Sequence, residues 1–134
     1  MAEGYFRELC RRAGKKIEVA SAGTMAVDGA VPSPNSVETL MKCEGINISG
    51  HKSSALTYDA VDNADLVVTM GQSHKMQICH AWPEAANKVL VLGAFKSDGC
   101  DIADPFGGSY AVYEQCFKGM KEALDNLFLD IVNS

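Results

Sequence analysis

The chain has 134 residues, of which 47% are hydrophobic and 22% charged, and its formal net charge is −5. This length and composition are typical of one globular domain, and the acidic balance argues against nucleic acid or an anionic membrane as a partner. No apolar run approaches the roughly 20 residues of a membrane span. The five cysteines are odd in number and include no Cys-x-x-Cys pair, so they indicate neither a disulfide framework nor a zinc site. We therefore expect a cytoplasmic protein with reduced thiols.

Helices and short apolar strands alternate along the chain. Helices are indicated by apolar residues at steps of three and four, strands by compact aliphatic runs, and helix starts by Ser or Thr before the first turn. The predicted elements, in chain order, are a helix at Ala2–Ala13, a strand at Ile17–Ala20, a helix from Ser33-Pro34 to Gly45, a short helix from Thr57 to Val61, a strand at Leu66–Met70, a helix at Ser73–Trp82, a strand at Val89–Leu92 and a long helix from Ser109 to Ile131. Strands separated by helices predict an α/β fold with a parallel sheet. The predicted strands at Leu66–Met70 and Val89–Leu92 look like strands buried on both faces of a sheet.

The segment Asp104–Ser109, with the sequence Asp-Pro-Phe-Gly-Gly-Ser, places a carboxylate on a rigid turn before the last helix. Proline fixes its own φ and holds the residue before it in extended geometry, while the glycines allow a sharp turn and Ser109 can cap the helix. A carboxyl group held in this way suits general-acid catalysis. The alternative is a capped turn whose Asp104 only orders the loop.

Several further stretches, in a fixed order, make the chain resemble the low-molecular-weight protein-tyrosine phosphatases, and within them the bacterial protein-arginine phosphatase branch. The matching stretches are Met1–Glu3, Ser21–Thr24, Ser33–Asn35, Gly50–Ser53, Ala64–Val67, Met70, His74-Lys75 and Asp104–Ser109. The resemblance implies a three-layer α/β fold around a four-stranded parallel sheet of order 2-1-3-4. It also implies hydrolysis of phosphorylated proteins through a cysteinyl-phosphate, without metal or other cofactor, with Asp104 as general acid and then general base.

The family's nucleophile, which lies in a Cys-x5-Arg loop after the first strand, has no counterpart in this sequence. No cysteine is followed by arginine six residues later, and the three arginines, Arg7, Arg11 and Arg12, all fall in the first predicted helix. We therefore expect no nucleophile in this chain and no phosphoester hydrolysis at an enzymatic rate. The matching stretches begin just after that loop in the family order, so the sequence suggests a truncated family domain at 1–134.

In the family order the strand that is missing here is the central one, between Ile17–Ala20 and Leu66–Met70. Unpaired strand edges in a core are costly. We expect either that these two strands pair directly or that a second copy supplies a strand or helix by exchange, giving a homo-oligomer.

Other residues are candidates for the substrate site. The resemblance gives His51 the role of bracing the phosphate loop and puts Met25 at the substrate mouth, beside Pro105 and Phe106. Both residues also have a purely structural alternative. His51 is then a surface histidine, or a core histidine whose hydrogen bonds are satisfied, and Met25 packs on the core. His74-Lys75 could meet an anion but more simply forms a solvated first helical turn. A redox relay between Cys79 and Cys100 is rejected, because they are 21 residues apart on different elements; Cys10, Cys43 and Cys116 fit the apolar faces of their helices.

Two classes of function stay open. The first is a phosphatase for phosphotyrosine or phosphoarginine whose gene starts upstream of Met1, which the preceding DNA would settle. The second is a non-catalytic pseudophosphatase that binds a partner or self-associates. The glycine pair Gly107-Gly108 after Phe106, where animal relatives carry a second aromatic residue, tilts the choice toward phosphoarginine.

Overall fold

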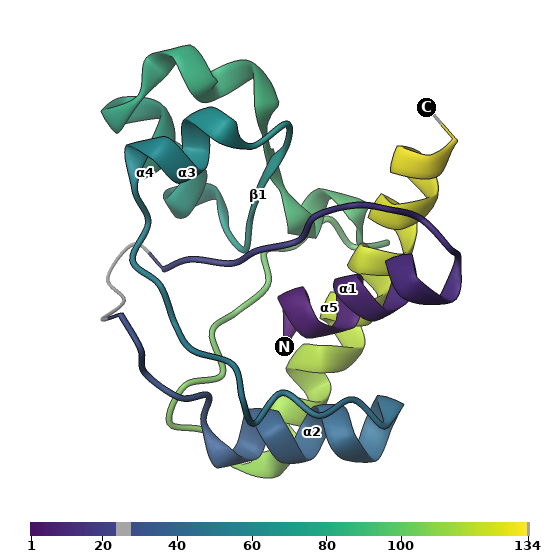
Figure 1. Cartoon of the computed structure of the whole chain (residues 1–134). Helices are drawn as coiled ribbons and strands as arrows, with labels where there is room; N and C mark the ends of the chain where they lie inside the picture. Colours follow the sequence, from purple (N-terminus) through teal and green to yellow (C-terminus); the bar gives the residue numbers. More distant parts are fainter. Residues whose placement is uncertain (24–27, 134) are drawn as a thin grey trace.

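A computed structural model describes residues 1–23 and 28–133 of the chain. Helices dominate, and a small parallel sheet lies among them (Figure 1). The helices are α1 (Ala2–Arg12), α2 (Pro34–Glu44), α3 (Tyr58–Asn63), α4 (Gln72–Ala81) and α5 (Tyr110–Val132), the 3-10 helices are η1 (Pro83–Lys88) and η2 (Leu92–Phe95), and the strands are β1 (Val67–Thr69) and β2 (Val89–Val91). No helix among these residues is long and apolar enough to cross a membrane.

The helix starts predicted from the sequence are confirmed by their capping bonds. Oγ of Ser33 accepts a hydrogen bond from N–H of Ser36, Oγ1 of Thr57 accepts one from Ala60, and Oγ of Ser109 accepts one from Val112. These bonds satisfy backbone donors that a helix leaves unpaired in its first turn. At the other end of α2, Gly45 adopts the left-handed conformation expected of a helix-ending glycine, with φ of 67°.

The sheet is smaller and less buried than predicted. β1 pairs in parallel with β2, in the register Val67 with Val89, Val68 with Leu90 and Thr69 with Val91. The expectation that both strands are buried on both faces is wrong, because Val67, Val68 and Leu90 are only half-buried. No other strand in 1–23 or 28–133 pairs with β1, so only one of its edges carries a strand partner.

The predicted strand at Ile17–Ala20 is also wrong as a sheet element. A strand exists through hydrogen bonds to a neighbour, and this segment has no such ladder in the described chain. Its apolar side chains Ile17 and Val19 nevertheless pack against the main core, and the carbonyl oxygen of Val19 accepts a hydrogen bond of 2.6 Å from the guanidinium of Arg7. Direct pairing of this segment with β1 is therefore not observed, while exchange with a second copy stays a prediction.

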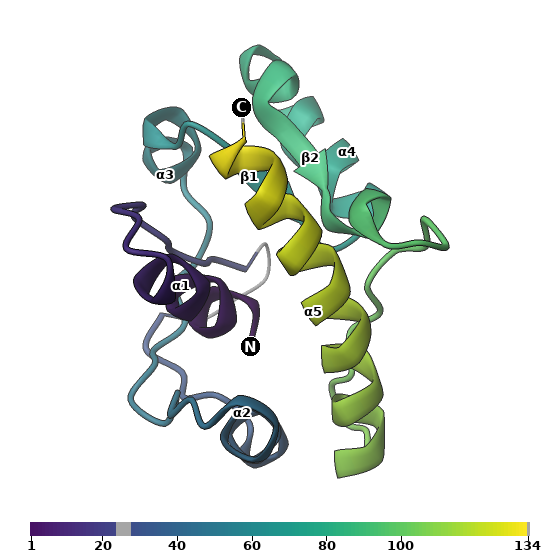
Figure 2. The same cartoon turned by 90° about the vertical axis from the view of Figure 1, so that its right-hand side faces the viewer.

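Helix α5 forms the centre of the molecule. Figure 2 shows it running between α1 and α2 on one side and β2 and α4 on the other. The ring of Tyr5 on α1 meets the edge of Phe117 on α5 with centroids 5.4 Å apart. The main core consists of Tyr5, Phe6, Cys10, Leu40, Leu92, Ile102, Phe117, Met120, Ala123, Leu124 and Leu127. Because α5 begins directly after the Asp104–Ser109 segment, this core also anchors the predicted general acid.

Candidate functional site

Asp104 lies exposed at the start of a tight turn that leads into α5. Its Oδ1 accepts a hydrogen bond of 3.0 Å from N–H of Phe106, and the carbonyl of Pro105 accepts one of 2.8 Å from N–H of Gly108. Gly107 has φ of 80°, the positive value that a type II turn requires at its third residue. The turn therefore fixes the direction in which the carboxylate leaves the backbone, as the Asp-Pro pair predicted.

Two contacts from other elements hold this turn in place. Nδ2 of Asn35, in the first turn of α2, donates a hydrogen bond of 3.1 Å to the carbonyl oxygen of Gly108. N–H of Ile102, just before the turn, donates one of 2.9 Å to the carbonyl oxygen of Met70 at the end of β1. The carboxylate is thus mounted between α2 and the sheet, which suits a group that must meet a reacting atom in one geometry.

Phe106 presents an aromatic ring to solvent next to this carboxylate. Its side chain is 83% exposed, more than that of any other large hydrophobic residue in the described chain. Pro105 beside it is half-buried. An exposed ring on a rigid turn next to an acid is able to stack on a flat substrate group.

The thiol of Cys116 lies within the electrostatic influence of Asp104, yet it is a poor nucleophile. Burial, and then the negative charge of Asp104, raise the pKa of the Cys116 thiol. Its Sγ lies 3.3 Å from the carbonyl oxygen of Ala103, to which it donates. A thiol that stays protonated at neutral pH does not attack phosphorus, so Cys116 does not replace the absent Cys-x5-Arg cysteine.

His51 lines a cleft of about 520 Å³ between α1 and the segment 46–51. Its Nδ1 is 3.5 Å from Oε2 of Glu3, which also pairs with Arg7 at 3.0 Å. The other carboxylate oxygen of Glu3 accepts a hydrogen bond of 2.7 Å from Oγ of Ser21. Glu3, Arg7, Ser21 and His51 therefore form one polar cluster on the wall of this cleft.

The structure does not bring all predicted site residues together. The residues that line the His51 cleft do not include Asp104, Pro105 or Phe106. Met25 lies outside the described residues. Sequence reasoning missed Glu3 and Ser21 as partners of His51; the signal was present, since both stand in the matching stretches Met1–Glu3 and Ser21–Thr24.

The suggested anion contact at His74-Lys75 has a competitor. Oδ2 of Asp101 accepts a hydrogen bond of 3.1 Å from N–H of Gln72 and so caps the start of α4 from a distant loop. A carboxylate already holds the position that an anion would take at this helix end. His74 is exposed on the first turn of α4, as the solvated alternative predicted.

The cysteines and acidic groups form no further reactive cluster in the described residues. Cys10 is buried as predicted, Cys116 is half-buried, and Cys43 is exposed, so its assignment to a buried face is wrong. Cys43 lies in the last turn of α2, where that face reaches solvent. In the part of the chain that the structure describes, no three His, Cys, Asp or Glu side chains gather in a way that could hold a metal ion.

Comparison with known proteins gives matches along the whole chain. The family model described as low molecular weight phosphotyrosine protein phosphatase matches residues 1–134. A protein-arginine-phosphatase of Bacillus subtilis (strain 168) is 34% identical over 128 residues, which cover 95% of this chain and 84% of the relative. The low molecular weight protein-tyrosine-phosphatase PtpB of Staphylococcus epidermidis is 35% identical over 109 residues, covering 81% of this chain and 76% of the relative. The crystal structure of a low molecular weight protein tyrosine phosphatase from T. tengcongensis superimposes with a TM-score of 0.90 at 34% identity, covering 96% of this chain and 88% of that one.

Proposed function

The chain belongs to the low molecular weight phosphotyrosine protein phosphatase family, and we propose that its fold serves the hydrolysis of phosphorylated side chains of proteins. The observation that carries this proposal is the Asp104 turn. Its carboxylate is exposed, bonded to N–H of Phe106 and mounted between α2 and β1. In this role Asp104 protonates the leaving group when the phosphoryl group is transferred, and afterwards takes a proton from the attacking water.

The other predicted residues receive subsidiary roles in the same proposal. Phe106 and Pro105 form one wall of the substrate site, against which a flat phenol or guanidinium can stack. His51, held by Glu3, acts as a support for the phosphate-binding loop of the family. The role of Met25 at the substrate mouth stays an expectation from the family resemblance, because this residue lies outside the described residues. No metal or other cofactor takes part in the proposed reaction.

The 134 residues contain no Cys-x5-Arg, so the group that attacks phosphorus and the arginine that would hold the phosphate are both absent from this sequence. Cys116 does not compensate, because its thiol pKa is raised. We therefore propose that this chain alone does not turn over phosphoesters. The second candidate function, a pseudophosphatase that binds a partner or self-associates, rests on the same missing motif.

Sequence identity to the relatives does not decide whether the substrate residue is phosphotyrosine or phosphoarginine. The arginine phosphatase of Bacillus subtilis and the tyrosine phosphatase of Staphylococcus epidermidis are 34% and 35% identical to this chain. We favour phosphoarginine, since Phe106 is followed by Gly107 and Gly108 and the open turn leaves room beside a single ring.

The test compares two proteins: the 134-residue chain, and the same residues preceded by a strand and a Cys-x5-Arg-Ser-Pro segment. Both are assayed with an aryl phosphate, a phosphotyrosine peptide and a phosphoarginine peptide. We expect turnover only for the extended protein, and a loss of about 100-fold or more in kcat when Asp104→Asn is introduced there.

Robust turnover by the short chain would refute its inactivity. An extended, folded protein that stays inactive on every substrate, together with a defined oligomer in light scattering, would favour the pseudophosphatase instead. Full activity of Asp104→Asn would remove Asp104 from the mechanism.

A further inference from the structure

A second surface, away from Asp104 and His51, combines two aromatic rings with acidic side chains. Tyr58, the first residue of α3, is 44% exposed, and its ring centroid lies 6.0 Å from that of Trp82, which ends α4. The two planes meet at 51°. Trp82 also packs against the small core cluster under α3 and α4, so its ring is held in place. The pair is an ordered aromatic surface and not two independent side chains.

Carboxylates surround these rings. Asp62 lies four residues after Tyr58 and so shares its face of α3, while Glu84 lies two residues after Trp82 in η1. Both are exposed, as is Asp59 in the first turn of α3. The charge of Asp62, followed by that of Glu84, raises the pKa of the Tyr58 phenol, and a side-chain hydrogen bond between Tyr58 and Glu84 raises it further.

One cation, Lys88, lies at the end of α3, where its Nζ donates to the backbone carbonyl oxygens of Asp62 and Ala64, at 3.1 and 2.8 Å, and not to a carboxylate. Within the described residues, no Lys, Arg or His forms an ion pair with the carboxylates of Asp59, Asp62 or Glu84. With three carboxylates and one lysine, the surface therefore offers aromatic faces together with an excess of negative charge.

We propose that the Tyr58–Trp82 surface, with Asp62 and Glu84, is a docking site for an arginine side chain of a partner protein. The argument is charge complementarity joined to ring geometry. A guanidinium is planar, stacks on aromatic faces and at the same time donates to carboxylates in two directions. An ammonium group of lysine makes a point contact only, and an uncharged group gains little from either feature. A basic, arginine-bearing segment is the partner that this surface fits best.

Trp82 is the only tryptophan of the chain, so its indole N–H gives a single resonance that reports on this surface. The 134-residue chain is titrated with three blocked peptides of equal length that carry two arginines, two lysines or two citrullines between glycines. Citrulline keeps the shape of arginine but not its charge. We expect a saturable shift of the indole resonance with the arginine peptide, a binding constant weaker by about threefold with lysine, and no saturation with citrulline. Raising the salt concentration weakens the arginine complex.

Variants assign the response to these side chains. Tyr58→Leu weakens binding of the arginine peptide by about threefold, while Tyr58→Phe, which keeps the ring, preserves it. The pair Asp62→Asn and Glu84→Gln weakens it by about fivefold. Asp130→Asn, which neutralises one exposed acid near the end of α5, is the control for the loss of a carboxylate elsewhere on the surface and leaves binding unchanged. Unaltered thermal unfolding shows that Tyr58→Leu is folded.

Three results would overturn the proposal. The first is equal binding of the citrulline and arginine peptides, and the second is an indole resonance that saturates with calcium chloride but does not respond to the arginine peptide. The third is unchanged binding of the arginine peptide in both Tyr58→Leu and the Asp62 and Glu84 double variant. None of these measurements depends on phosphatase activity, so the proposal stands or falls separately from the proposed function.

Discussion

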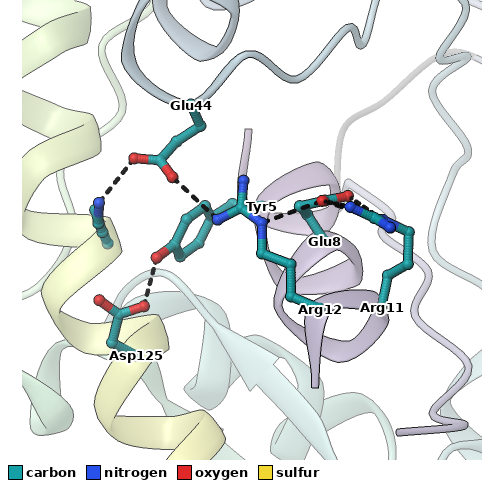
Figure 3. A network of polar contacts seen from close by, with 7 residues as sticks. Tyr5, Glu8, Arg11, Arg12, Glu44 and Asp125 are labelled. Carbon is teal, nitrogen blue, oxygen red and sulfur yellow. Dashed lines mark hydrogen bonds and ion pairs between the residues drawn. The ribbon is translucent and has the colours of Figure 1, made fainter. Parts of the chain in front are cut away.

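The hydroxyl of Tyr5 donates a hydrogen bond to Oδ1 of Asp125, and this partly buried bond joins α1 to α5 (Figure 3). Tyr5 is only 2% exposed, and its ring and that of Phe117 pack edge to face. The two helices so joined begin near the two halves of the candidate site, α1 with Glu3 and α5 directly after the Asp104 turn. The Tyr5–Asp125 bond thus links the helix that carries Glu3 to the helix that follows the Asp104 turn.

Replacing Tyr5 by phenylalanine tests the strength of this link. The ring and its packing remain, but the half-buried carboxylate of Asp125 loses its donor, so we expect the free energy of unfolding to fall by about 1–2 kcal/mol. Urea denaturation of both proteins measures the difference. Tyr110→Phe is the matched control, because the hydroxyl of Tyr110 donates to Glu114 one turn along the same helix, at 3.2 Å, and joins no second element; we expect a change below about 0.5 kcal/mol. Equal losses in both variants would contradict the special role of Tyr5.

The same residue predicts a dependence of stability on alkaline pH. Burial, followed by the hydrogen bond to Asp125, raises the pKa of Tyr5 well above its ordinary value of 10.0. In the unfolded chain the phenol loses its proton near pH 10, whereas in the folded protein it keeps it, so this contribution is complete below about pH 10 and is lost as pH rises beyond it. The stability advantage of the natural protein over Tyr5→Phe should therefore shrink as pH rises from about 10 to 11 and beyond. A constant difference across that range would show that Tyr5 titrates normally.

A second link in Figure 3 joins α2 to α1 and α5 through Glu44. Its side chain is 9% exposed and pairs with Lys121 on α5 at 2.7 Å and with Arg12 on α1 at 3.5 Å. Because the carboxylate is buried while its partners are half-exposed, we expect Glu44→Gln to reduce the free energy of unfolding by about 1–2 kcal/mol. Glu38→Gln, which breaks the exposed pair with Lys42 on the same helix, should cost less than about 0.5 kcal/mol. Thermal unfolding at low salt measures both, and a larger loss for Glu38→Gln would contradict this ranking.

Local features of this fold were predictable from the sequence, because they depend on neighbours along the chain. The caps Ser33, Thr57 and Ser109 each bond within three residues, and the Asp104 turn closes on Phe106 and Gly108. The strand at Ile17–Ala20 failed for the opposite reason. Its residues have strand composition, but a strand needs a partner that composition does not reveal, and the described chain supplies none.

The buried face of α2 shows why apolar patterns misplace a helix. Apolar spacing alone predicts Val37, Leu40 and Met41 as the core face of α2, yet Met41 is 46% exposed, whereas Ser36 and Thr39 are buried. Both hydroxyls donate to carbonyls one turn earlier, Ser36 to Ser33 and Thr39 to Asn35, so these polar residues enter the core with their hydrogen bonds satisfied. The partners of His51 and the cap from Asp101 escaped for a related reason, since each joins segments far apart in the sequence.

Gly93 predicts how strongly the Asp104 turn depends on close backbone packing. A Cβ atom at Gly93 would lie 2.2 Å from the carbonyl oxygen of Cys100, a contact that only backbone movement can relieve. Such movement displaces the segment that bonds Ile102 to Met70 immediately before Asp104. We expect Gly93→Ala to lower the free energy of unfolding by about 3 kcal/mol or more and to accelerate amide hydrogen exchange at Ile102.

Gly50→Ala is the control for Gly93→Ala, because a Cβ at Gly50 meets no atom within 4 Å and its backbone does not adopt a positive φ. There the added methyl group reduces the freedom of the unfolded chain without a clash, so stability should stay within about 0.5 kcal/mol of the natural protein or rise slightly. If both variants unfold at the same urea concentration and Ile102 exchanges at an unchanged rate, the backbones at Gly93 and Cys100 lie farther apart than described. The position of Asp104 would then depend on its own turn and on the Asn35 contact rather than on the packing of η2.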